Sequence, residues 1–236
     1  MPPHSSPHIQ LPPNKSKNIY FKSEKKMLSH FTKTRMLVCD MAGTTVNEGG
    51  VVYRTLYETL RKFSVPITQD DVDHWYGHSK HEVLGHFIEE EKKLEDAKRI
   101  FDKQLLWNYE RGSISLVDPL LPGHFNRMRD RGIVVALNTG YSKEVQDVIV
   151  DRLRMDSFID TRISSSEVPR GRPHSDMMIE LSLRTLIPPV NMVKVGDTQA
   201  DVDEAINIGA LPLGVLTGAE CNFLRCPIVL DSVMEL

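Results

Sequence analysis

A short apolar run ends in an aspartate at residues 36–45, which read MLVCDMAGTT. Met36, Leu37, Val38 and Cys39 carry no charge, and such a run is typical of a buried strand. Asp40 follows directly, and the small residues after it favour a tight loop. A carboxylate that ends a buried strand is held at a fixed place on the edge of a sheet. Asp40 is therefore the first candidate for a chemical role.

Strands and helices alternate in the C-terminal half of the chain. Further strands are expected at residues 133–137, 159–163, 192–195, 211–216 and 228–230. Helices are expected at residues 124–131, 143–154, 175–186 and 200–208. Gly132 and Gly209 stand where helix C-caps are expected. This alternation predicts an α/β fold, with a Rossmann-like parallel sheet and helices on both of its faces.

One stretch departs from this alternation. Residues 51–114 show helical periodicity and no strand pattern, and Pro66 and Gly77 are expected to separate helices. Helices are expected at residues 53–63, 69–76, 80–92 and 94–111. We expect these residues to form a helical cap inserted between the first and second strands, with 117–123 as the return linker. The α/β core is then residues 35–50 and 115–236.

Composition excludes several classes of protein. The 236 residues are 40% hydrophobic and 26% charged, which is ordinary for a soluble globular protein and unlike collagen, mucins or wholly disordered chains. The net charge of -3 gives no reason to expect nucleic acid as a partner. No run approaches the roughly 18 apolar residues that a membrane helix needs. Three cysteines are too few for a disulfide scaffold, so we expect a reducing, cytoplasmic compartment.

The first 34 residues are predicted to be a disordered basic arm. Residues 1–35 carry seven Lys or Arg and one Glu, a net charge of +6, which leaves -9 for the rest of the chain. The arm is rich in Pro, His, Ser and Asn and lacks apolar periodicity. It has neither the hydrophobic segment of a secretory signal nor the arginines of a convincing transit peptide. We expect a solvated tail, with organelle targeting left open.

Polar clusters follow three predicted strands, at the edge where open α/β sheets bind ligands. They are residues 40–45, the Asn-Thr-Gly of 138–140 and the Gly-Asp-Thr-Gln-Ala-Asp of 196–201. Asp197 and Asp201 are four residues apart, so on a helix start they would share one face. Three carboxylates that meet, these two and Asp40, would repel each other. A divalent cation would relieve the repulsion, and oxygen ligands favour Mg²⁺. Asp197 could also cap the helix that follows.

Anion-binding groups complete this predicted site. The Thr139 hydroxyl and the Gly140 backbone N–H can hold phosphate oxygens beside a helix N-terminus. Arg172, in the Gly-Arg-Pro of residues 171–173, offers a planar fork of donors for the same dianion. The clusters together predict a site for Mg²⁺ and a phosphoryl group.

With these motifs in order, residues 35–236 resemble the haloacid dehalogenase-like hydrolase superfamily, and within it the phosphonatase (phosphonoacetaldehyde hydrolase) branch. The resemblance implies that Asp40 is the nucleophile that forms an aspartyl-phosphate. It implies Mg²⁺ ligation by Asp40, the backbone carbonyl of Ala42 and Asp197, with Asp201 as a further metal-site carboxylate that often acts through water. It assigns phosphate binding to Thr139 and Arg172. The helical insertion corresponds to a cap that closes over the site and excludes water.

Two details place the chain near the phosphonatases. Phosphatases of the superfamily usually carry a general acid two residues after the nucleophile, where this chain, like phosphonatase, has Ala42. Lys80, three residues after Gly77, matches the cap lysine that forms an imine with the substrate aldehyde. Imine chemistry needs a partly neutral amine, which a charged His78 or His81 nearby would favour. A solvated lysine that opens a cap helix, or a plain phosphate ligand, are the alternatives.

One departure keeps the substrate open. Val83 stands where phosphonatase has a histidine implicated in proton transfer. Three functions remain: a hydrolase of phosphonoacetaldehyde or a related small phosphonate, a phosphatase for a small phosphomonoester, and a non-catalytic binding protein on the same fold. The resemblance also implies a homodimer through the cap.

Overall fold

The computed structural model describes residues 32–68, 71, 75, 78–218 and 225–236. The predicted arm of residues 1–34, apart from its last three residues, and nearly all of the predicted helix at 69–76 lie outside the described residues. Within the described residues, no helix combines the length and apolar character needed to span a membrane.

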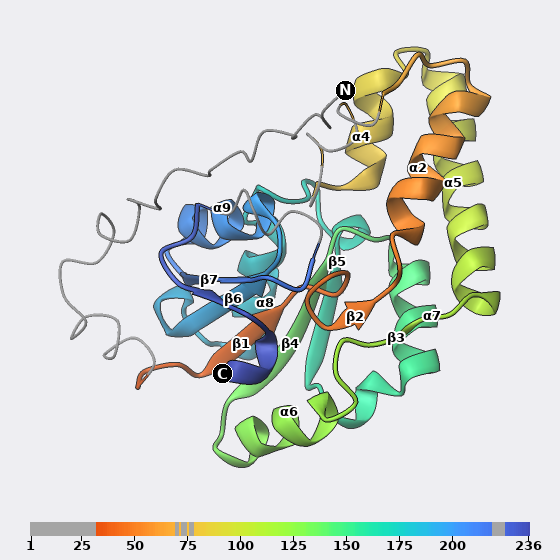
Figure 1. Ribbon diagram of the computed structural model, residues 1–236. Coiled ribbons are helices and arrows are strands. Elements are labelled where there is room, and N and C mark those ends of the chain that lie inside the picture. The colour runs from red at the N-terminus through yellow and green to blue at the C-terminus, as the bar shows by residue number, and fades with distance from the viewer. Residues whose placement is uncertain (1–31, 69–70, 72–74, 76–77, 219–224) are drawn as a thin grey trace, which may run out of the picture.

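Six parallel strands form the main sheet in the order β5-β4-β1-β6-β7-β8 (Figure 1). Counted along the chain within this sheet, the order is the 3-2-1-4-5-6 of doubly wound nucleotide-binding folds. The predicted α/β fold is confirmed. The strands are β1 (Met36–Cys39), β4 (Val134–Thr139), β5 (Thr161–Ser164), β6 (Met192–Gly196), β7 (Leu211–Val215) and β8 (Val229–Leu230).

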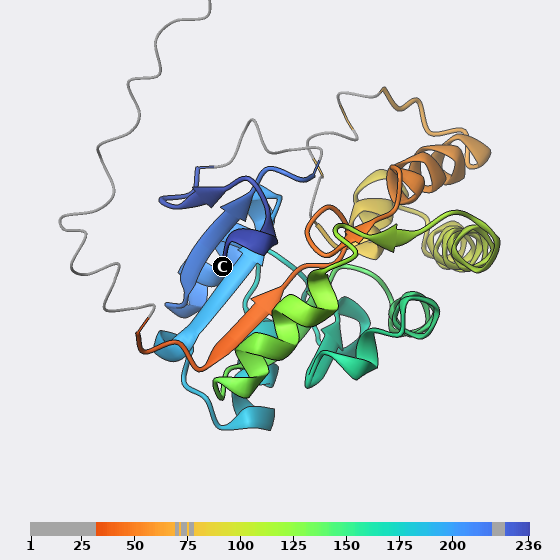
Figure 2. The same ribbon diagram turned by 60° about the horizontal axis from the view of Figure 1, so that its bottom comes forward.

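Four long helices cover the two faces of this sheet (Figures 1 and 2). Along β1, Cys39 packs with Phe125 and Ile149 on one face, whereas Val38 packs with Leu181 on the other. This alternation of side chains is what a two-faced core requires. The helices are α6 (Leu121–Asp130) and α7 (Lys143–Leu153) on the first face, and α8 (Asp176–Thr185) and α9 (Gln199–Ile208) on the second.

The chain leaves the sheet after β1 and returns to it at α6. Between them lie β2 (Val46–Asn47), α2 (Val51–Lys62), α4 (Lys80–Phe87), α5 (Glu91–Arg111) and β3 (Ser115–Leu116). The buried residues of α5 recur every four positions, at Ala97, Phe101, Leu105 and Tyr109, and this stripe packs the helix into the apolar cluster shared with α2. The three helices lie together beside one end of the main sheet (Figure 1).

The structure corrects two boundaries and adds one pair of short strands. The helix predicted at 80–92 ends at Phe87, because Ile88 adopts an extended backbone and buries its side chain. The return linker is shorter than the predicted 117–123, since α6 begins at Leu121 with a proline in its first turn, where no intrahelical N–H is needed. β2 and β3 pair antiparallel through Val46 and Leu116, although neither was expected as a strand.

Gly132 and Gly209 end α6 and α9 as predicted. Both adopt positive φ, 80° and 81°, the left-handed conformation in which glycine has no steric penalty. The ends of these helices then turn directly into β4 and β7.

Candidate active site

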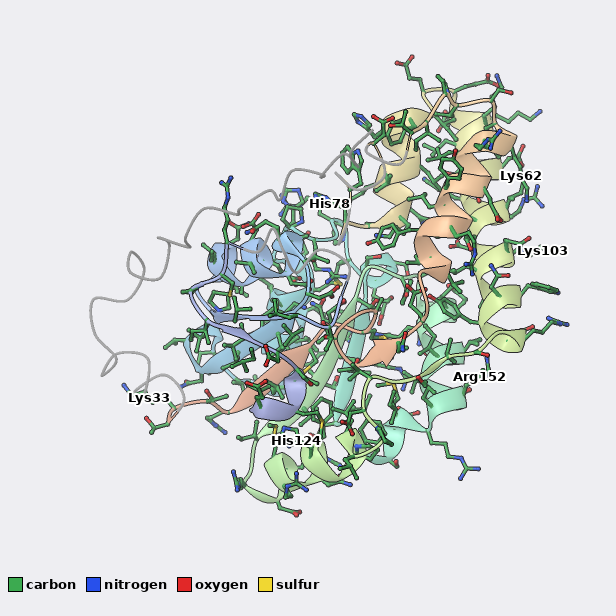
Figure 3. The ribbon with its side chains drawn as sticks, viewed as in Figure 1. Lys33, Lys62, His78, Lys103, His124 and Arg152 are labelled. Atoms are coloured by element: carbon green, nitrogen blue, oxygen red, sulfur yellow. The ribbon has the colours of Figure 1, made fainter. Side chains whose placement is uncertain are left out.

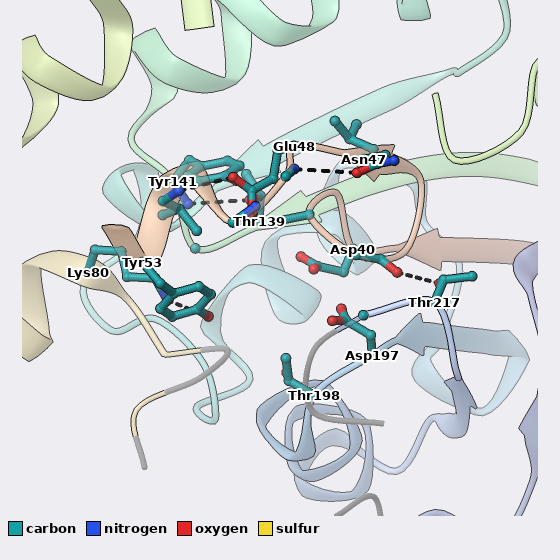
Figure 4. Close-up of a pocket in the computed structure, with 18 of the residues that line it drawn as sticks. Asp40, Asn47, Glu48, Tyr53, Lys80, Thr139, Tyr141, Asp197, Thr198 and Thr217 are labelled. Atoms are coloured by element: carbon teal, nitrogen blue, oxygen red, sulfur yellow. Dashed lines mark hydrogen bonds between the residues drawn. The ribbon is translucent and has the colours of Figure 1, made fainter. Parts of the chain in front are cut away.

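Asp40 lies where β1 ends, in the middle of the sheet. Its backbone N–H donates to the Val195 carbonyl of the neighbouring strand at 2.9 Å, and its side chain is buried. It lines a cavity of about 520 Å³ between the core and the cap helices (Figure 4). The adjacent β6 belongs to the other half of the fold, so this cavity opens at the point where the strand order reverses.

The loop after Asp40 turns tightly because Gly43 makes it possible. Gly43 has φ of +77°, and a Cβ added there would lie 2.3 Å from Oδ2 of Asp197. The Thr45 hydroxyl donates to the Asp40 carbonyl at 2.9 Å, and the Thr44 hydroxyl donates to Asp197 at 3.2 Å. The glycine therefore lets the loop lie directly against the second carboxylate.

Three carboxylates meet at this point, as the sequence suggested. Asp40, Asp197 and Asp201 are all buried, and one oxygen of each lies within 4.8 Å of the others. Burial raises the pKa of Asp40, and burial together with the charges of Asp40 and Asp201 raises the pKa of Asp197 well above its usual value. Without a cation, the fold therefore favours the protonated forms of Asp40 and Asp197.

Asp201 behaves differently from its two neighbours. Burial acts to raise its pKa, but the charges of Arg172 and Lys194 outweigh it and lower the pKa to about 2. Lys194 Nζ donates to Asp201 at 2.6 Å, and Arg172 also bonds to Asp201. Asp201 lies behind the cavity and not in its wall, so two buried cations fix its charge from the protein side.

Arg172 also reaches Asp40. Its Nη1 lies 2.9 Å from Asp40 Oδ1, in a geometry that does not make a hydrogen bond, so that buried oxygen has no hydrogen-bond donor among the described residues. Burial would lower the pKa of Arg172, but the charges of Asp201 and Asp40 raise it. Its Nε is buried and has no acceptor in the described part of the chain, although the side chain lines the cavity. That N–H can donate to an anion bound there.

The helix after β6 is capped by Thr198 and not by Asp197. The Thr198 hydroxyl accepts from the Asp201 backbone N–H, so the predicted capping role of Asp197 is wrong. Asp197 precedes the helix and does not share a helical face with Asp201. The two carboxylates converge because Gly196 leaves room: a Cβ there would lie 2.2 Å from the Asp201 carboxyl carbon.

Thr139 and Gly140 lie at the end of β4, on the other side of Asp40. Both line the cavity, and the Thr139 hydroxyl accepts from the Tyr141 backbone N–H at 3.4 Å. The N-terminus of α7 follows at Lys143. Of the predicted site residues, all except Asp201 line this one cavity; they are Asp40, Ala42, Lys80, Thr139, Gly140, Arg172 and Asp197.

Lys80 enters the cavity from the cap, as the first residue of α4. Its side chain is only 6% exposed, and Nζ donates to the Tyr53 hydroxyl at 3.1 Å and to the His78 carbonyl at 2.7 Å. Gly171 lies beside it, since a Cβ on Gly171 would approach the Ser79 Cβ to 2.8 Å. The Gly171 N–H donates to Glu82 of α4 at 3.0 Å. The start of α4, which carries Lys80, thus contacts the arginine loop of the core, residues 171–173.

The two other cap positions singled out in the sequence lie away from the cavity wall. Val83 is fully buried in the apolar cluster. His81 pairs with Asp102 of α5 at 2.9 Å, with about a third of its side chain exposed. Figure 3 shows His78, whose carbonyl holds Lys80, between α4 and the core. His81 is thus held by α5, and an effect of a charged His78 or His81 on Lys80 stays a prediction.

A cluster of phenols that the sequence did not reveal joins cap and core. The hydroxyls of Tyr109 from α5 and Tyr141 from the core lie 2.8 Å apart, and Tyr109 donates to Glu48 at 3.2 Å. Burial raises the pKa of both tyrosines well above the usual value. At the far end of α7, Arg152 donates to the Gly112 carbonyl at 3.0 Å, just past the end of α5 (Figure 3). These contacts hold the cap against the core on either side.

Comparisons with known proteins agree with this geometry. A profile of the haloacid dehalogenase-like hydrolases matches residues 34–209. The chain belongs to this hydrolase family. Phosphonoacetaldehyde hydrolase from Bacillus cereus (strain B4264) is 26% identical over 205 residues, which are 79% of this chain and 77% of that protein. The predicted membership, on the phosphonatase-like side of the superfamily, is confirmed.

Solved structures share the fold over most of the chain. A phosphonoacetaldehyde hydrolase-like protein from Oleispira antarctica superposes with a TM-score of 0.75 at 19% identity, covering 86% of this chain and 90% of its own. CbbY from Rhodobacter sphaeroides, solved with phosphate, gives a TM-score of 0.73 at 17% identity, covering 86% of this chain and 96% of its own. At these identities the likeness establishes the fold.

Enzymes of this family generally use Mg²⁺, and the residues present fit that ion. Asp40 offers a buried oxygen without a hydrogen-bond donor, and Asp197 has a raised pKa that a nearby cation would lower. All the side chains that could ligate the ion are carboxylates, which suit a hard cation.

Glu204 gives the metal-free protein a pH-dependent stability. Burial raises its pKa from 4.5 to about 7, although Lys194 and Arg172 act against the shift. Between these values the folded protein keeps a proton that the unfolded chain has released, so stability falls as pH rises through this interval. We expect Glu204 to contribute on the order of 3 kcal/mol to that fall. Asp40 and Asp197, with raised pKa values, act in the same direction.

Glu204→Gln should therefore flatten this dependence. Its amide oxygen can still accept from Asn138, which donates to Glu204 at 3.1 Å. The measurement is thermal unfolding in EDTA between about pH 5 and 7.5. Glu144→Gln, at an exposed position of α7, is the control. An unchanged slope in Glu204→Gln would show that Glu204 is ionised throughout.

Proposed function

We propose that this protein is an Mg²⁺-dependent hydrolase that cleaves the carbon–phosphorus bond of phosphonoacetaldehyde or a related small phosphonate. The observation that carries this proposal is the amine of Lys80, which shares a cavity with Asp40. Ala42 stands where a phosphatase of the family would have its general acid. A carbon leaving group that departs as an enamine needs no such acid, whereas it does need an amine.

Each core residue has a role in this proposal. Asp40 attacks phosphorus and becomes an aspartyl-phosphate. Thr139, Gly140 and the unpartnered Nε of Arg172 hold the phosphoryl oxygens. Asp40, the Ala42 carbonyl and Asp197 would hold Mg²⁺, with Asp201 behind them. The ion, when bound, neutralises charge on the phosphoryl group.

The helical segment completes the site. We propose that residues 51–114 act as a cap over a core of residues 35–50 and 115–236. Lys80 comes from this segment, and the Glu82 contact with the Gly171 N–H joins it to the arginine loop. A closed cap excludes water, which strengthens the electrostatic contacts and protects the intermediate from early hydrolysis. A homodimer through the cap and a cytoplasmic location stay predictions.

Borohydride trapping tests the proposed amine chemistry. With phosphonoacetaldehyde and Mg²⁺, borohydride should inactivate the enzyme and leave a reduced adduct on Lys80, located by mass spectrometry. Lys80→Arg should give no adduct and lose activity by about 10³-fold or more, since a guanidinium cannot form the imine. Lys62→Arg, at the end of α2, is the matched control and should behave as wild type. Turnover of phosphonoacetaldehyde without any adduct in the wild type would overturn the imine mechanism.

A phosphatase for a small phosphomonoester is the second candidate. Val83 favours it, because a buried valine replaces the histidine that phosphonatase uses for proton transfer. In that case Lys80 would bind substrate as a cation. Phosphate esters that turn over faster than phosphonoacetaldehyde in a substrate panel would establish this alternative.

A further inference from the structure

Tyr53 places its hydroxyl against the amine of Lys80. Tyr53 lies in the first turn of α2 and Lys80 opens α4, so two separate cap helices bring the groups together. Nζ lies 3.1 Å from the hydroxyl oxygen and 4.5 Å from the ring centroid. Both residues line the cavity that contains Asp40 (Figure 4). A group with a transferable proton therefore stands at the predicted point of imine formation.

Two oxygens that accept from Lys80 help to orient its amine. They belong to the Tyr53 hydroxyl and the His78 carbonyl, and both are uncharged groups. A neutral amine has two N–H bonds and one lone pair. With N–H bonds directed at these acceptors, the lone pair can be turned toward a carbonyl carbon in the cavity that Lys80 lines. A phenol that accepts one of these bonds can still donate its own proton.

We propose that Tyr53 is the acid–base group of imine formation, giving its proton to the carbonyl oxygen of the substrate as Lys80 attacks. This inference rests on the proposed phosphonate hydrolysis. It supplies the proton-transfer group that Val83 does not. The Tyr53 hydroxyl has a proton to give, whereas His78 meets Lys80 through its backbone carbonyl.

The protons of both steps are exchanged with Tyr53. As the amine nitrogen forms a bond to the carbonyl carbon, the π electrons of the C=O bond move to oxygen, which takes the phenolic proton. The nitrogen then carries one proton too many and returns it to the phenolate, which leaves a neutral carbinolamine. In the second step the carbinolamine hydroxyl takes the phenolic proton and departs as water, giving the iminium ion and a phenolate. The opposite charges of this pair lie within contact distance.

Other candidate groups in the same region have different partners. The hydroxyls of Tyr109 and Tyr141 bond to each other, and Tyr109 donates to Glu48. His81 pairs with Asp102. The Glu48 carboxylate accepts from the backbone N–H groups of Gly50 and Val52 at the start of α2. Glu48 thus fixes the first turn of the helix that carries Tyr53, which keeps the hydroxyl in place.

The test is the rate of adduct formation in Tyr53→Phe. With phosphonoacetaldehyde and borohydride, we expect adduct formation on Lys80 to be at least about 10²-fold slower than in wild type. In wild type the rate should pass through a maximum and fall at alkaline pH, as the phenol ionises. In Tyr53→Phe the rate should rise continuously with pH, because only the neutral amine is then required. Inhibition by inorganic phosphate should be unchanged, which shows an intact core site.

Tyr57→Phe is the matched control. Tyr57 lies one turn further along α2, with its ring beneath the Arg61 guanidinium at 5.7 Å, and its loss of a hydroxyl should change the rate less than about twofold. A Tyr53→Phe adduct that forms at the wild-type rate and with the wild-type pH profile would overturn the role of Tyr53 alone. A wild type that forms no adduct would overturn the proposed function and this inference together.

Discussion

Asp40→Asn should abolish turnover, lowering kcat by at least about 10⁴-fold, because the amide cannot attack phosphorus and no covalent intermediate can form. The loss should appear with every substrate that the enzyme accepts, whether phosphonate or phosphate ester. This prediction therefore does not depend on which leaving group proves correct. It tests the nucleophile common to both proposed functions.

The same change should not unfold the protein. Burial raises the pKa of Asp40, so ionising this carboxyl is unfavourable in the metal-free fold. An amide of the same shape removes that cost and weakens the repulsion of Asp197. We expect thermal unfolding in EDTA to be unchanged or to move to higher temperature. Asp203→Asn, whose carboxylate accepts from Gln199 on the outer side of α9 at 2.8 Å, is the control and should keep its activity. A folded Asp40→Asn protein with activity within tenfold of wild type would show that the nucleophile lies elsewhere.

The parts that could be predicted from sequence are those carried by local patterns. The run that ends at Asp40 forms β1, and the alternation that follows forms the parallel sheet and its helices. Asp40, Thr139 and Asp197 follow three neighbouring strands, and parallel strands bring their ends to one edge. Once the topology is known, their convergence follows.

The parts that could not be predicted depend on contacts between distant segments. The Lys80–Tyr53 bond joins residues 27 apart on two helices, and the spacing alone gives no sign of it. β2 and β3 are two residues each, too short for the alternation that identifies a strand. The sequence does carry a sign of Lys194, which is a lysine inside the apolar run of β6. Because lysine is almost never fully buried without a partner, this position indicates a buried ion pair.

Buried cations explain how an acidic protein could bind the dianion proposed as its substrate. Residues 36–236 carry a net charge of -9, and three buried carboxylates meet beside the predicted phosphoryl position, two of them in the cavity wall. Lys194 neutralises Asp201 from behind the cavity, and Arg172 does so from the cavity wall, while Lys80 faces the cavity from the cap. The local charge therefore depends on a few fixed side chains, and a change in one of them should have a large effect.

Arg172→Lys is expected to lower kcat/KM by about 10²-fold, although it keeps the positive charge. The guanidinium spans two directions: Nη1 faces Asp40 and Asp201, while the buried Nε lacks an acceptor in the described part of the chain. A lysine is a point charge and cannot serve both. Because the ammonium can still pair with Asp201, we expect the free energy of unfolding to fall by less than in a variant that lacks this charge.

Comparison with Arg172→Met separates the effect of Arg172 on activity from its effect on stability. It leaves Asp201 with Lys194 as its one remaining cation among the contacts described, and loss of one partner of a buried ion pair costs about 3–5 kcal/mol. Activity and stability should therefore fall together in Arg172→Met, whereas Arg172→Lys should lose activity with a smaller loss of stability. Arg170→Lys is the matched control, since Arg170 pairs with Asp176 at 2.8 Å on the exposed side of the same loop. Wild-type kcat/KM in Arg172→Lys would mean that this arginine only balances the charge of the carboxylates and does not bind the phosphoryl group.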